Sequence, residues 1–133
     1  MPVQTIGAHI GRVGIASLFL LGGLNKIMSF AETAERMEAV GLTPAIILLP
    51  ATIALELIGG AMIAFKLRYA WIAAGLLAIF TLATNAFFHR FWELPGQIAE
   101  LELSLFFKNV SIAGGLIFVA TALFKSSRQS TTV

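Results

Sequence analysis

One acidic side chain, Glu56, lies deep inside an apolar run of this sequence that covers residues 45–65. If that run crosses a bilayer, an ionised group near its centre costs about 2.5–3.5 kcal/mol on insertion scales, so it needs a partner, a cavity or a short route to water. A carboxyl in hydrocarbon is either protonated or held ionised by a cation, and it can therefore exchange a proton. We predict that Glu56 is a proton acceptor.

Arg12 is the predicted partner of Glu56. Measured from the end of each apolar run at 1.5 Å per residue, Glu56 lies about 18 Å and Arg12 about 24 Å from the same membrane face. An arginine side chain can span the difference of about 6 Å. We predict a structural ion pair between Arg12 and Glu56. The sequence leaves open whether this pair only clamps two helices or also handles protons or a ligand.

A second group of polar residues is predicted near one membrane face, at the ends of three apolar runs. Its members are Lys26, His89, Lys108, Asn25, Asn85 and Asn109. Lysine neutralises negative charge, asparagine supplies hydrogen bonds and histidine exchanges a proton near neutral pH, a combination that suits a small polar or anionic head group. The alternative is that the lysines reach to the interface and the histidine belongs to an interfacial belt. We predict a ligand-binding site here.

The composition places these residues in a membrane protein. The 133-residue chain is 58% apolar and only 12% charged, whereas a soluble domain of this size needs more polar surface. Disorder is excluded because the chain is rich in aliphatic residues and has a net charge of only +2. With no Cys, and with His9 and His89 expected at opposite faces, no metal or haem site is predicted. The basic residues are scattered singly, which argues against nucleic-acid binding.

Four apolar runs are long enough to cross a bilayer, and they cover residues 7–28, 45–65, 69–88 and 105–124. They predict an all-α fold, an integral membrane four-helix bundle that forms a single domain over residues 1–124. Short surface helices are expected in the two outer connections, residues 29–44 and 89–104. Residues 125–133 are polar and are predicted to form a disordered tail.

Loop charges predict the orientation of this bundle. Four basic residues, Lys66, Arg68, Lys125 and Arg128, lie in the loop and tail on the side of both termini. The other side carries acidic connections. Because positive loops stay in the cytoplasm, we predict that both termini are cytoplasmic.

The ordered set of motifs resembles the DoxX-like family. The elements are Arg12, Phe-x-x-x-Gly-x-x-Lys from Phe19 to Lys26, Gly-Leu-x-Pro from Gly41 to Pro44, Glu-x-x-Gly-Gly from Glu56, His-x-Phe-Trp from His89, and Lys108-Asn109 followed by Gly114-Gly115. The resemblance covers almost the whole chain and implies a four-helix bundle in a bacterial cytoplasmic (inner) membrane. It also implies kinship with a membrane subunit of a thiosulfate:quinone oxidoreductase and with a membrane redox complex that handles oxidative stress. A sulfur-exchange role does not carry over to a chain without Cys, whereas a quinone-facing role does.

These features give one leading hypothesis and two alternatives. The leading hypothesis is a quinone-interacting membrane subunit of an oxidoreductase complex, with a redox partner protein, a diffusible quinone and no covalently bound cofactor. In it Glu56 accepts a proton, while Lys26, His89 and Lys108 polarise the oxygens of the ligand. The alternatives are a small proton-coupled transporter that uses the embedded glutamate and a non-catalytic scaffold subunit. The lipid bilayer is the expected partner in every case, and a homo-oligomer is compatible with each.

Overall fold

A computed structural model describes residues 2–132 of the chain. Its elements in chain order are α1 (Val3–Met28), α2 (Phe30–Ala39), α3 (Ala45–Ala64), α4 (Ala70–Phe88), the short 3₁₀ helix η1 (Phe91–Glu93) and α5 (Gly96–Thr131). Within residues 2–132 there is no strand, and α1, α3, α4 and α5 are each long and apolar enough to cross a membrane. The predicted all-α fold with four long apolar helices is therefore confirmed.

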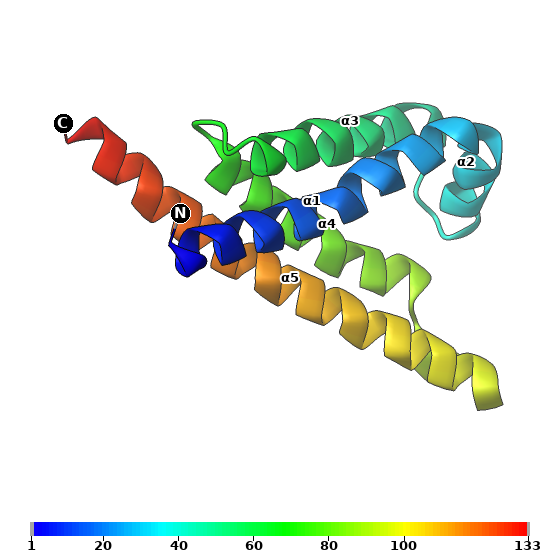
Figure 1. The fold of residues 1–133 in the computed structure, drawn as a ribbon. Helices are drawn as coiled ribbons and strands as arrows, with labels where there is room; N and C mark the ends of the chain where they lie inside the picture. Colours follow the sequence, from blue (N-terminus) through cyan, green and yellow to red (C-terminus); the bar gives the residue numbers. More distant parts are fainter. Residues whose placement is uncertain (1, 133) are drawn as a thin grey trace.

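The four long helices pack as two pairs. Helix α1 lies along α3, and α4 lies along α5 (Figure 1). Contacts between α3 and α4 join the pairs, whereas α1 and α5 touch only over a short stretch. In the view of Figure 1 the two pairs diverge toward the end that carries α2. This end, where α1 and α4 finish and α3 and α5 begin, is called the α2 end below.

Two adjacent glycines let α3 approach both of its neighbours closely. A Cβ atom on Gly59 would stand 3.1 Å from the Leu77 side chain of α4. A Cβ atom on Gly60 would stand 3.0 Å from the Leu20 side chain of α1. Small residues at helix contacts in a membrane permit this close packing of backbones. The pair therefore fixes α3 between α1 and α4.

The outer surface of the bundle is apolar. Large hydrophobic side chains are exposed on every long helix, among them Ile10 on α1, Ile46 on α3, Ile79 on α4 and Phe118 on α5. An apolar exterior costs nothing in lipid, because lipid tails are as apolar as these side chains. The same surface in water would be an aggregation site. The exterior thus agrees with a bundle that is embedded in a bilayer.

The two outer connections differ from each other. The first contains α2, whose buried Met37 packs with Ala45 and Leu49 of α3; its placement on the membrane surface stays a prediction. The separate surface helix predicted in the second connection is wrong. There α5 begins at Gly96 and continues unbroken into the membrane-crossing part, because no Gly or Pro interrupts residues 97–113.

The disordered tail predicted for residues 125–133 is also wrong over residues 125–131, which extend α5; Val133 lies outside the described residues. No Gly or Pro follows Gly115 in the chain, so nothing in the sequence ends the helix. The hydroxyls of Ser127, Ser130 and Thr131 bond to helix carbonyls three or four residues earlier. These side chains therefore bond within the helix and do not compete with it.

Candidate functional site

A cavity of about 580 Å³ lies at the α2 end, between the α1–α3 pair and α4. Apolar side chains from four helices form most of its wall, including Phe19, Met37, Leu48, Phe80 and Phe87. Its polar lining includes Lys26, Thr52, Glu56, Thr81, Thr84, His89 and Asn109, and Arg36 of α2 stands among them. Small-molecule sites in proteins have this character, a mainly apolar cavity with a few placed polar groups.

The central feature of the cavity is an ion pair between Lys26 and Glu56. The Nζ atom of Lys26 donates to Oε1 of Glu56 over 3.0 Å. Glu56 as a residue is only 4% exposed, whereas the side chain of Lys26 is 26% exposed. The second carboxylate oxygen of Glu56, Oε2, is buried and has no hydrogen-bond donor within residues 2–132. The carboxylate is thus half satisfied, with an acceptor left free beside a cavity.

Helical spacing positions both members of this pair. On α1, Gly22 and Lys26 are four residues apart and share a face, so the lysine side chain lies over the glycine. A Cβ atom at Gly22 would be 3.6 Å from both carboxylate oxygens, which shows how closely the α1 backbone approaches Glu56. On α3, Leu48, Thr52 and Glu56 repeat every fourth residue and all face the cavity. The site is a product of these two helix faces.

The predicted ion pair between Arg12 and Glu56 is wrong. The Nε atom of Arg12 donates instead to the backbone oxygen of Ala64, at 3.4 Å, where α3 ends. Unpaired carbonyls at a helix C-terminus accept such bonds and favour a nearby cation. Ala64 stands two turns beyond Glu56, about 12 Å along the helix axis, so Arg12 belongs to the opposite end of the bundle.

The reason for the error lies in the register of α1 and α3. Gly23 lies against the side chain of Leu57. From that level α1 continues only about 7 Å to Met28, whereas α3 reaches back about 18 Å to Ala45. Helix α3 therefore extends past the end of α1, and α2 packs on the part that extends. This shift brings Glu56 level with the last turns of α1 and within reach of Lys26.

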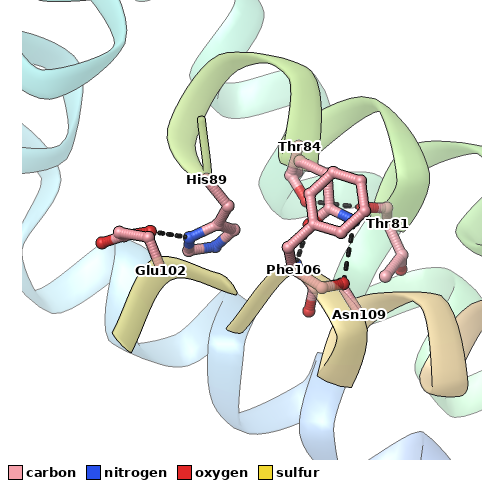
Figure 2. A network of polar contacts seen from close by, with 7 residues as sticks. Thr81, Thr84, His89, Glu102, Phe106 and Asn109 are labelled. Carbon is pink, nitrogen blue, oxygen red and sulfur yellow. Dashed lines mark hydrogen bonds and ion pairs between the residues drawn. The ribbon is translucent and has the colours of Figure 1, made fainter. Parts of the chain in front are cut away.

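A second polar network links α4 to α5 beside the cavity (Figure 2). The Nδ2 atom of Asn109 donates to Oδ1 of Asn85 over 2.9 Å, and Nδ2 of Asn85 donates to the backbone oxygen of Phe106 over 3.1 Å. Nearer the α2 end, Nδ1 of His89 lies 2.6 Å from Oε2 of Glu102 (Figure 2). These three contacts hold the N-terminal half of α5 against the end of α4.

The residues of the predicted cluster are only partly brought together. Lys26, His89 and Asn109 line the cavity, and Asn85 is buried directly behind Asn109. Lys108 and Asn25 do not line it, and both are exposed. Successive residues on a helix point about 100° apart, so neither Lys108 with Asn109 nor Asn25 with Lys26 can share one face. The predicted six-residue cluster was therefore too large.

Sequence reasoning missed the aromatic side of the site and the partner of His89. Phe19, Phe80, Phe87 and Phe88 line the cavity, and Glu102 was placed in a connection and given no role. The cavity residues of α4 fall between positions 80 and 88 at helical spacing. This pattern could have identified Phe80, Phe87 and Phe88 from the sequence. Among residues 2–132, no three His, Cys, Asp or Glu side chains are placed so that they could hold a metal ion.

Comparison with known proteins identifies the family. The sequence profile of the DoxX family matches residues 7–90, more than half of the chain. The chain belongs to the DoxX family. Lys26, Glu56 and His89 all lie within the segment that matches the DoxX profile, whereas Asn109 lies beyond it.

Two curated relatives of this DoxX protein come from Escherichia coli K12. Inner membrane protein YphA is 31% identical over 112 residues, which cover 84% of this chain and 79% of the relative. Inner membrane protein YqjF is 34% identical over 119 residues, which cover 89% of this chain and 85% of the relative. No solved structure matches the chain. The relatives and the four long apolar helices identify a multi-pass inner membrane protein.

Proposed function

We propose that this DoxX-family protein binds the head of a diffusible quinone in the cavity at the α2 end and serves as a membrane subunit of a quinone-linked oxidoreductase. The observation that supports the proposal is the half-satisfied carboxylate of Glu56, whose Oε2 atom is buried beside the cavity without a donor. A hydroquinone hydroxyl is a donor that suits Oε2, and a quinone carbonyl is an acceptor that suits the Lys26 ammonium. One ion pair thus offers complementary groups to both redox forms.

The shape and lining of the cavity support the same ligand. Its volume of about 580 Å³ falls in the range of about 300–1,000 Å³ that small-molecule sites occupy. The rings of Phe19, Phe80 and Phe87 offer faces against which a planar quinone ring can stack. A ligand that dissolves in the bilayer also needs no aqueous route to a site between membrane helices.

Quinone reduction consumes two electrons and two protons, and the cavity has groups for the protons. Glu56 accepts or donates a proton at Oε2, while Lys26 stabilises negative charge that develops on a quinone oxygen. His89 lines the cavity and contacts Glu102 outside it, so this pair can pass a proton between cavity and solvent. The electrons come from a redox partner protein in this proposal.

The test measures quinone bound to protein purified in a mild detergent. Lipids are extracted and quinone is quantified against protein for wild type, Glu56→Gln, Lys26→Met and the control Lys108→Met, which removes an exposed cation outside the cavity. We expect stoichiometric quinone in wild type and in the control, and at least about tenfold less in the two site variants, since a lost charge-assisted hydrogen bond weakens binding by about 1.5–3 kcal/mol. Quinone at bilayer background in wild type contradicts the proposal.

A proton-coupled transporter is the second candidate, and one observation favours it. Four phenylalanine rings line the cavity together with Glu56. Aromatic faces and a carboxylate together suit an organic cation. Proton release on adding an aromatic quaternary ammonium compound to wild type, absent in Glu56→Gln, would favour transport over quinone binding. If Glu56→Gln changes only the assembly with other subunits, the scaffold role remains.

A further inference from the structure

A second hollow, of about 420 Å³, lies at the opposite end of the bundle from the cavity. It is formed by the turn between α3 and α4, residues 65–69, and by the last turns of α5, residues 123–131. This part of the molecule is called the turn end below. Three cations line the hollow, Lys66, Arg68 and Arg128, and no acidic residue does.

Within residues 2–132, no acidic side chain neutralises the charge of the turn end. All seven acidic residues are glutamates, and none occurs between residues 57 and 92 or after residue 102. Within residues 2–132, the ion pairs of the protein involve none of the three cations of the hollow. Each of these side chains is therefore available to an external anion.

Aromatic rings hold the two guanidinium groups at this level. The Arg68 guanidinium lies over the Tyr69 ring, 5.2 Å from its centroid, and the Arg128 guanidinium lies 5.8 Å from the centroid of Phe124. Trp71 contacts Phe124 edge to face, with centroids 4.9 Å apart, and so joins α4 to α5 inside the hollow. Tyr and Trp gather at the level of lipid head groups. The cations thus stand where lipid phosphates lie.

We propose that the turn end binds an anionic phospholipid, with its phosphate held by Lys66, Arg68 and Arg128. Arginine matches the geometry of phosphate oxygens with two parallel donors, and basic pockets between membrane helices bind anionic head groups. Leu67 and Leu123 in the same hollow provide apolar surface for the acyl chains. This site is independent of the cavity at the α2 end.

The test uses Trp71 as a reporter inside the site. Trp92→Phe leaves Trp71 as the only tryptophan of the full chain. The protein is reconstituted in phosphatidylcholine vesicles that contain the same minor mole fraction of either brominated phosphatidylglycerol or brominated phosphatidylcholine, and quenching of Trp71 is compared. We expect a preference for phosphatidylglycerol well above fivefold, because each of the three cations contributes about a factor of five near an anionic surface.

Variants assign the preference to the cations. Arg68→Gln/Arg128→Gln is expected to reduce the preference to about fivefold, since one cation remains. Arg68→Lys/Arg128→Lys is expected to retain more of the preference than the glutamine double variant. The control Arg90→Gln/Lys108→Gln removes two exposed cations at the α2 end and leaves it unchanged. Should the first variant not fold, Arg128→Gln alone, in the last turns of α5, gives the same comparison.

Three results would overturn the proposal. The first is equal quenching by the two brominated lipids in the wild-type background. The second is an equal loss of preference in the control variant. The third is full loss of the preference on adding millimolar inorganic phosphate at constant ionic strength, because that would assign the hollow to a free anion and not to a lipid.

Discussion

Replacing Lys26 by Met removes the donor of the only hydrogen bond that the Glu56 carboxylate accepts among residues 2–132. Methionine keeps an unbranched apolar stem, so the packing against α3 is largely retained. The carboxylate is then left with neither oxygen bonded, at a residue that is 4% exposed. Removing one partner of a buried ion pair costs about 3–5 kcal/mol in the free energy of unfolding, and we expect about 3 kcal/mol because Lys26 is partly exposed.

Replacing Glu56 instead of Lys26 is expected to lower the free energy of unfolding much less. Glu56→Gln leaves the Lys26 ammonium without its partner, but the side chain is 26% exposed and lies near the end of α1. A lysine there can turn its ammonium toward the interface, so we expect a loss of about 1 kcal/mol. The double variant should lose no more than about 1–2 kcal/mol, which gives a coupling energy of about 2–3 kcal/mol between the two side chains.

Unfolding by titration with sodium dodecyl sulfate, followed by helical content, measures these free energies. Lys108→Met serves as the control, because it removes an exposed cation and should change stability by less than about 0.5 kcal/mol. Additive losses in the double variant, or a Lys26→Met variant as stable as the control, would refute the argument that Lys26 neutralises Glu56.

Three other substitutions test the packing and the network. Gly23→Ala places a Cβ atom 2.7 Å from the Leu57 side chain and should cost about 1–3 kcal/mol of unfolding free energy, whereas Gly114→Ala, with nothing within 4 Å, should be neutral in the same titration. Glu102→Gln weakens the contact with His89, so amide hydrogen exchange in the first turns of α5 should accelerate relative to wild type; unchanged exchange contradicts this role. Asn85→Leu leaves the Asn109 amide without its acceptor and should cost about 1 kcal/mol, while a stabilised variant would show that the bond contributes nothing.

The sequence was a sufficient guide to depth along a helix. Glu56 was identified because a carboxylate in the middle of a long apolar run has no route to water, and this depends only on its position in that run. The four membrane-crossing helices follow from the same one-dimensional property. Neither the identification of Glu56 nor that of the four helices needs knowledge of how the helices pack.

The register between helices was beyond the reach of the sequence. Gly23 meets Leu57 because α3 extends past α1. The sequence of neither helix alone indicates this axial offset between them. Lys26 was consequently predicted near one membrane face and Glu56 about 18 Å from it, although the two side chains are in contact. Rotation was the other missing quantity. Lys108 and Asn109 are neighbours in sequence, but only Asn109 faces α4 and the cavity.

The pairing of helices described above divides the molecule into two halves of unequal attachment. Each half is a tightly packed helix pair, and the halves are joined chiefly where Gly59 of α3 meets Leu77 of α4. On the other side, α1 and α5 touch only over a short stretch near Ile15 and Gly115. This level also holds one buried core shared by both halves, in which Ala16 and Phe19 of α1 lie with Leu77 of α4 and Leu116 of α5, and the pairs diverge from it toward the α2 end (Figure 1). A lipid-soluble molecule could then enter between the halves sideways, directly from the bilayer.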